Sequence, residues 1–109
     1  MLSMTLEEIK ELLLSVTTNT YHQDASTEED EYIVWAEDGE SDAVHADNRK
    51  ILQVLDVTVD VFTRSEYPEI IKRLQDAFNE AELPFELLSI QHERNTGYTH
   101  YEYLIQAVI

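Results

Sequence analysis

Two histidines near the carboxyl end, His92 and His100, have the spacing best suited to holding a metal ion. They flank the segment NTG at 95–97, which is typical of a turn between two strands. A three-residue turn would set the two imidazoles directly opposite each other across a hairpin, whereas a two-residue turn would separate them. No third ligand of obvious position accompanies the pair, so two surface histidines are expected rather than a metal site.

Two acidic clusters, EEDE at 28–31 and EDGESD at 37–42, contain enough carboxylates to hold a divalent cation. Neither has the alternating spacing or the twelfth-position acid of a calcium-binding loop, and a solvated charge run is the expected structure of both. Other acids are plentiful, but none is flanked by apolar residues in a way that predicts a raised pKa. The sequence therefore predicts no carboxylate pair for acid–base catalysis.

Other catalytic and cofactor motifs are missing from the sequence. With only two glycines, the chain forms neither a dinucleotide-binding GxGxxG nor a Walker loop. Cysteine is absent, which excludes a disulfide framework and thiolate chemistry and fits a reducing cytoplasm. No serine lies in a recognisable nucleophile elbow. We therefore expect a protein that is not an enzyme and that binds no cofactor.

The charge balance is strongly acidic. The 109 residues include 23 acidic and 7 basic side chains, for a formal net charge of −16. Lys and Arg supply most non-specific affinity for phosphates, so direct nucleic-acid binding is not expected. The amino terminus has acids where a secretory signal has basic residues, and no apolar run reaches the ~18 residues of a membrane span. The sequence predicts a soluble, unprocessed single domain that contacts no membrane.

Apolar periodicity predicts two helices. Residues 5–16 have capping-box spacing from Thr5 and an apolar stripe along one face. A second stripe extends from about residue 65 to 82, with Ser65 expected as its N-cap and Pro68 within its first turn. Both helices are therefore expected to bury one face against a sheet.

The predicted strands are, in chain order, 20–22, 32–37, 51–63, 85–94 and 98–109. The long third strand alternates, with one face of Leu55, Val57, Val59 and Val61 and another of Asp56, Thr58 and Asp60. Acidic loops are expected at about 23–31, mobile unless something binds it, and at about 38–48, opening on an Asp38–Gly39 turn. This order predicts an α+β domain with a mainly antiparallel sheet, both helices on one face, and a C-terminal β-hairpin.

The order of segments resembles that of the small tail terminator proteins of siphovirus-type bacteriophages and prophages, also called tail completion or head-to-tail joining proteins. The resemblance lies in an LEEIKELLL helix, a YIVWAED strand, an ADN tripeptide before a long strand ending VDVFTR, an amphipathic helix, and a hairpin ending YTHYEYLI. It covers nearly the whole chain, and residues 23–31 are its least family-like part.

The resemblance implies a structural protein of the virion tail that is assembled in the host cytoplasm. Copies of it would form a ring, commonly a hexamer, on the end of the finished tail tube. The ring would stop tube polymerisation and provide the surface to which the filled head docks, so its partners would be further copies, the tail tube protein and the head connector proteins. DNA would pass through the ring without binding, and an acidic lumen would repel it.

A ring of identical subunits needs heterologous contacts, in which one patch meets a different patch on the neighbour. One candidate patch is HADNRK at 45–50, which includes Asp47, Asn48, Arg49 and Lys50 and brings rare positive charge into an acidic chain. The other is the exposed side of the long strand and the hairpin, represented by Asp56, Asp60, Tyr98 and His100. Ordinary solvated surface is the alternative reading of both.

Charge alone also leaves open a different class of function, an acidic DNA mimic that inhibits a DNA-binding enzyme by presenting carboxylates in place of phosphates. Mimicry favours acids spread along one elongated surface. Here many acids are concentrated at 23–31 and 37–47. The tail terminator is therefore the leading hypothesis.

Overall fold

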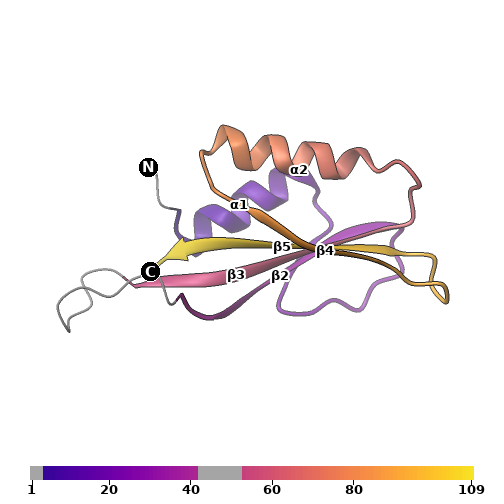
Figure 1. Ribbon diagram of the computed structural model, residues 1–109, viewed down its shortest axis with the longest axis horizontal. Helices are drawn as coiled ribbons and strands as arrows, with labels where there is room; N and C mark the ends of the chain where they lie inside the picture. Colours follow the sequence, from indigo (N-terminus) through magenta and orange to yellow (C-terminus); the bar gives the residue numbers. More distant parts are fainter. Residues whose placement is uncertain (1–3, 42–52) are drawn as a thin grey trace.

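The computed structural model describes residues 4–41 and 53–109, in which helices and strands follow the predicted order. Their bounds are α1 Leu6–Val16, β1 Thr20–His22, β2 Glu31–Glu40, β3 Val54–Thr63, α2 Glu69–Glu80, β4 Glu86–His92 and β5 Thr99–Val108. Both helices lie on the same face of one twisted sheet (Figure 1). The predicted α+β class is confirmed.

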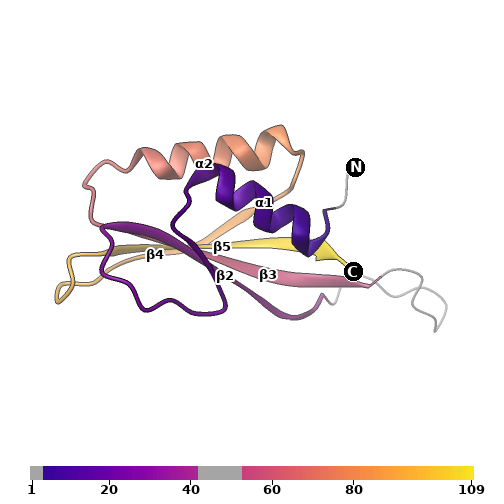
Figure 2. The same ribbon diagram turned by 180° about the vertical axis from the view of Figure 1, so that it is seen from behind.

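The five described strands form one sheet in the order β1-β2-β3-β5-β4. Only β1 and β2 pair in parallel, and the other neighbours are antiparallel. The short strand β1 and the hairpin strand β4 are therefore the two edges. Figure 2 shows from behind that α1 and α2 both cover one side, and that the loop between β1 and β2 runs on the other.

The core lies between the helices and the sheet. The helices contribute Ile9 and Leu13 from α1 and Ile70, Leu74 and Phe78 from α2. The sheet contributes Ile33, Trp35, Val57, Val59, Val61, Tyr103, Ile105 and Ala107. The predicted apolar alternation of the third strand is thus confirmed from Val57 to Val61. Burial of each large apolar side chain contributes roughly 1.5–3 kcal/mol, so this layer is the main source of stability.

The start of α1 matches its sequence pattern. The hydroxyl of Thr5 accepts a hydrogen bond from the Glu8 amide at 3.2 Å, and the Thr5 amide donates to the Glu8 carboxylate at 2.9 Å. These two bonds satisfy amides that a helix amino terminus otherwise leaves without partners. The predicted capping box is confirmed.

The start of α2 differs from the prediction. Pro68, with no side-chain capping bond, is the N-cap, so Ser65 does not cap the helix. The reason is steric, because a proline disfavours helical geometry in the residue before it, here Tyr67. At the other end Glu82 adopts a positive φ of 55°, and the amide of Leu83 donates back to the Phe78 carbonyl at 2.9 Å. This left-handed stop ends the helix close to the predicted position.

The predicted Asp38–Gly39 turn is wrong. Strand β2 continues to Glu40, and a register shift between Glu37 and Gly39 marks a β-bulge. Pairing with β3 keeps these residues in the sheet, and Gly39 adopts a φ of +150° that side-chain-bearing residues rarely accept. Of the predicted second acidic loop, residues 38–40 therefore belong to the strand, Ser41 directly follows it, and 42–48 lie outside the described residues.

Candidate functional site

The sheet face opposite the helices carries a row of aromatic side chains from three strands. The side chains of Ile33, Val61 and Tyr101 face the helices. Because side chains alternate along a strand, the residues next to them in sequence, Tyr32, Phe62 and His100, face the other side of the sheet. Tyr32 on β2 pairs with Phe62 on β3, and Phe62 pairs with His100 on β5. The three neighbours therefore stand side by side. We call Tyr32, Asp60, Phe62, Arg64, Tyr98 and His100 the open-face cluster.

The rings of this cluster are stacked closely. Ring centroids are 4.9 Å apart for Tyr32 and Phe62 and 4.3 Å apart for Phe62 and His100, with both pairs within 14° of parallel. Tyr98 stands edge-on to Tyr32 and Phe62. The guanidinium of Arg64 lies 4.0 Å from the centre of the Tyr98 ring, in a cation–π contact. Burial raises the pKa of the Tyr32 hydroxyl above its ordinary value.

The acidic loop between β1 and β2 is anchored to this cluster. The Tyr98 hydroxyl donates to the Glu29 carbonyl at 2.5 Å. Arg64 donates to the Asp30 carboxylate at 3.0 Å and to the Glu28 carbonyl at 3.4 Å. The sequence predicts a solvated loop that is mobile unless something binds it, and in the structure it is held by two side chains that border the strands, Arg64 after β3 and Tyr98 before β5.

This anchoring changes the position of Tyr98. The sequence places Tyr98 on the exposed side of the hairpin, but only 6% of the residue is exposed. It points to the helix-free face, where the acidic loop covers it. Tyr98 therefore links the loop to the sheet and is not a free contact residue.

His100 forms an ion pair with Asp60. The imidazole Nε2 lies 2.8 Å from Asp60 Oδ1, and about a quarter of each side chain is exposed, 22% and 26%. The hydrogen bond to Asp60 raises the pKa of His100, burial opposes it, and the charges of Asp60, Glu102 and Glu93 add smaller upward effects. The pair therefore favours the imidazolium form of His100 over the neutral form.

This pair predicts a pH-dependent stability. The pKa of His100 in the folded protein lies above its unfolded value of about 6.5. The contribution of the ion pair to the free energy of unfolding is therefore fully present below about pH 6.5 and is lost as the pH rises through the folded pKa. His100→Gln should lower the free energy of unfolding by about 1 kcal/mol at pH 5.5 and by much less at pH 8.5. Urea unfolding at both pH values measures this. His92→Gln is the matched control, since His92 bonds to Thr99, and equal losses at both pH values for His100→Gln would contradict the prediction.

The hairpin register separates the two histidines considered as metal ligands. His92 pairs with Thr99, and His100 pairs with Gln91. The connection is longer than the NTG segment, with the Glu93 amide donating to the Tyr98 carbonyl at 2.8 Å. Within residues 4–41 and 53–109, no group of three or more potential ligands could hold a metal ion.

The remaining candidate contact residues divide into two groups. Asp56 shares the helix-free face with Asp60 but lies four residues along β3, about 13 Å away, where its carboxylate accepts a hydrogen bond from Gln106. Asp47, Asn48, Arg49 and Lys50 lie outside the described residues. Of the predicted residues, the structure thus brings together Asp60, Tyr98 and His100.

Sequence reasoning missed three members of the open-face cluster, Tyr32, Phe62 and Arg64. The alternation that places Asp60 on the helix-free face also places Phe62 there, so this signal was present. Arg64 follows the strand and gave no local signal, because its contacts are with residues more than thirty positions away.

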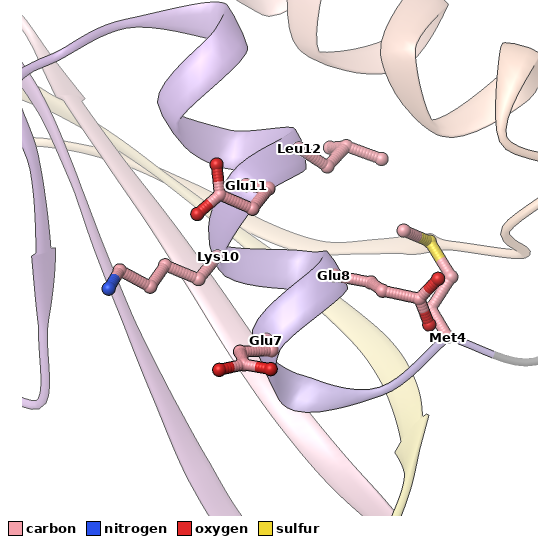
Figure 3. Close-up of a pocket in the computed structure, with 6 residues that line it drawn as sticks. All are labelled: Met4, Glu7, Glu8, Lys10, Glu11 and Leu12. Atoms are coloured by element: carbon pink, nitrogen blue, oxygen red, sulfur yellow. The ribbon is translucent and has the colours of Figure 1, made fainter.

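A separate pocket lies beside α1 and is lined by Met4, Glu7, Glu8, Lys10, Glu11 and Leu12. Figure 3 shows the acids spread along the helix, with Lys10 projecting away from Glu8 and Leu12. The Glu8 carboxylate is already bonded to the Thr5 amide. The lining therefore offers no converging catalytic set. Neither α1 nor α2, the helices of the described residues, is long and apolar enough to cross a membrane.

The fold of this chain is also found in a solved structure of a known particle. Neither protein-family models nor curated proteins match this sequence. The two-layer α+β fold is found in a solved structure, a chain in the virion of a native gene transfer agent particle. The TM-score is 0.53 and the identity 16%, and the match covers 94% of this chain and 87% of that chain. At this identity the likeness shows a common fold.

Proposed function

We propose that this protein is a structural subunit of a phage or phage-like virion, and that its role is that of a tail terminator. The observation that carries the proposal is the fold shared with a virion chain over 94% of this chain. The segment order of the sequence supports the same assignment independently of the structure. The role requires neither an active site nor a cofactor.

In this role, copies of the chain form a ring on the end of the completed tail tube. The ring stops tube growth and presents the surface on which head connector proteins dock. A net charge of −16 per subunit keeps the passing DNA from binding to the ring. The protein then belongs to the virion tail and is present in the host cytoplasm during assembly.

The test is the mass of the purified full-length protein by light scattering, over a range of protein and salt concentrations, with electron microscopy of any assemblies. We expect rings of about six subunits of 12.7 kDa. Because like-charged subunits repel, assembly should increase as the salt concentration rises from 0.05 to about 0.5 M and screening shortens the Debye length several-fold.

A DNA mimic gives a different result in the same preparation. It would remain a monomer or dimer at every salt and protein concentration, and it would inhibit a non-specific nuclease acting on duplex DNA. That combination would overturn the terminator proposal.

A further inference from the structure

The elements α1 and β1 form an arm that is joined to the rest of the fold by one short connection. We call residues 4–22 the arm and residues 23–30 the hinge. Parallel neighbouring strands are usually joined by a crossover of about a dozen or more residues, most often a helix. Here β1 and β2 pair in parallel, and only the eight residues of the hinge, without a helix, connect them.

The hinge is strained at its first residue. Gln23 has a positive φ of 76°, a conformation that is unfavourable for a residue with a side chain. The hinge also contains Asp24, Glu28, Glu29 and Asp30, and extending it increases the distance between these like charges. Short hinge loops under strain favour domain swapping, in which an element leaves its own copy and takes the same place in another copy.

The arm is an integral part of the fold. Ile9 and Leu13 of α1 are fully buried in the core. At the other end of the arm the His22 ring stacks on Trp35 of β2 with centroids 4.0 Å apart, and His22 Nε2 lies 2.5 Å from the Glu37 carboxylate. A fold without its arm would expose this core surface to water. The place must therefore be filled, either by the copy's own arm or by the identical arm of another copy.

We propose that neighbouring copies exchange their arms, so that α1 and β1 of one copy lie beside β2 of the next. The occupant is a second copy because its arm matches this surface residue for residue, and every contact of the arm is retained. Exchange lets the hinge extend, which relieves the backbone at Gln23. Each copy gives its arm to one neighbour and receives an arm from another, so the contact is heterologous and can close into a ring. The inference rests on the proposed function and deepens it, since it names the contact that joins the subunits of the ring.

The anchors of the hinge limit how far the arm can reach. Tyr98 and Arg64 hold Glu29 and Asp30 against the sheet, so residues 23–27 are the part that extends. From the end of β1 to the anchored residues, the fully extended chain spans roughly 20 Å. The vacant place beside β2 of the neighbour must lie within that distance.

The absence of cysteine makes the exchange directly testable. Tyr21 of the arm pairs with Val34 of β2, at a separation that permits a disulfide. The double variant Tyr21→Cys with Val34→Cys is concentrated, oxidised and run on a non-reducing denaturing gel. An arm in its own copy gives single chains, whereas an exchanged arm links different copies, and we expect the ladder of linked copies.

A matched control uses two strands that never separate. Ala36→Cys with Thr58→Cys joins β2 to β3 of the same copy, where these residues pair. This variant should give single chains at every concentration. A ladder of equal strength in the control would show random linking and would remove the evidence for exchange.

Changes in the hinge test the same proposal without cysteine, by light scattering. Gln23→Gly accepts the positive φ freely, so it favours the unexchanged copy and should weaken association about 5-fold. Ser26→Gly is the control, because it adds the same residue where φ is not positive, and it should leave association unchanged. Deletion of Ala25 and Ser26 hinders return of the arm to its own copy and should strengthen association. Circular dichroism confirms the folding of each variant.

The outcomes separate the exchange from the proposed function. If the cysteine pair gives only single chains although rings form, the exchange is wrong and the terminator proposal stands. If copies are linked only in pairs and no rings form, the exchange stands and the terminator proposal is overturned. If all variants remain monomeric and give single chains at every concentration, both are overturned.

Discussion

Phe78→Ala is expected to lower the free energy of unfolding by about 3–5 kcal/mol. Phe78 is fully buried in α2, and its ring packs against Phe85 and Tyr103 with centroids 5.1 and 6.0 Å away. Truncation removes this packing and leaves a cavity that the three-way aromatic contact cannot close. Since a domain of this size has a total stability of about 5–15 kcal/mol, the variant should be marginal or unfolded at 37 °C.

Thermal unfolding followed by circular dichroism measures this effect. The midpoint should fall by about 12–40 °C, at about 4–8 °C per kcal/mol for a domain of about this size. Asn79→Ala is the control, because Asn79 is the next residue of the same helix but is exposed, and its midpoint should change little. A fall of less than about 5 °C for Phe78→Ala would show that the helix does not pack on the sheet as described.

Tyr98→Ala is expected to cost about 3 kcal/mol and to release the acidic loop from the sheet. The substitution removes the hydroxyl that donates to the Glu29 carbonyl and the ring against which Tyr32, Phe62 and Arg64 pack. Tyr98→Phe keeps the ring and removes only the hydroxyl, so it should cost about 1 kcal/mol. The difference between the two variants separates ring packing from the hydrogen bond.

Limited proteolysis with a glutamyl endopeptidase reports loop release, because the loop contains Glu28 and Glu29. Cleavage there should be about 10-fold faster in Tyr98→Ala and a few-fold faster in Tyr98→Phe. Thr5→Ala, which removes a helix cap at a similar cost of about 1 kcal/mol, is the stability-matched control for Tyr98→Phe. Equal cleavage of Thr5→Ala and Tyr98→Phe would show that the hydroxyl does not anchor the loop.

The open-face cluster and the β4 edge differ in their chemistry. In the cluster, Arg64 and Tyr98 hold the acidic loop against the sheet, and His100 is hydrogen-bonded to the Asp60 carboxylate. From Leu87 to Gln91 the edge strand carries no formal charge, and its Leu87, Leu88 and Ile90 side chains are exposed.

The sequence by itself determined the elements and the side of each that is buried. The two-residue alternation around Val57 and Val59, the apolar stripes of the helices and the Thr5 capping box are local patterns. Each follows from the geometry of one element, so the predicted order and the face of the sheet that packs on the helices agree with the structure. The predicted turn at Asp38–Gly39 failed where pairing with β3 outweighed the local preference of the dipeptide.

Tertiary structure alone decided which side chains meet. Tyr98 contacts Glu29 across 69 positions in the chain, and Arg64 contacts Asp30 across 34. No local pattern predicts such contacts, because they depend on how the loop folds back over a sheet whose strand order is β1-β2-β3-β5-β4. The hairpin register likewise set His92 against Thr99 and turned His100 towards Asp60, since the length of the turn, and not the spacing of the histidines, fixes which residues lie opposite.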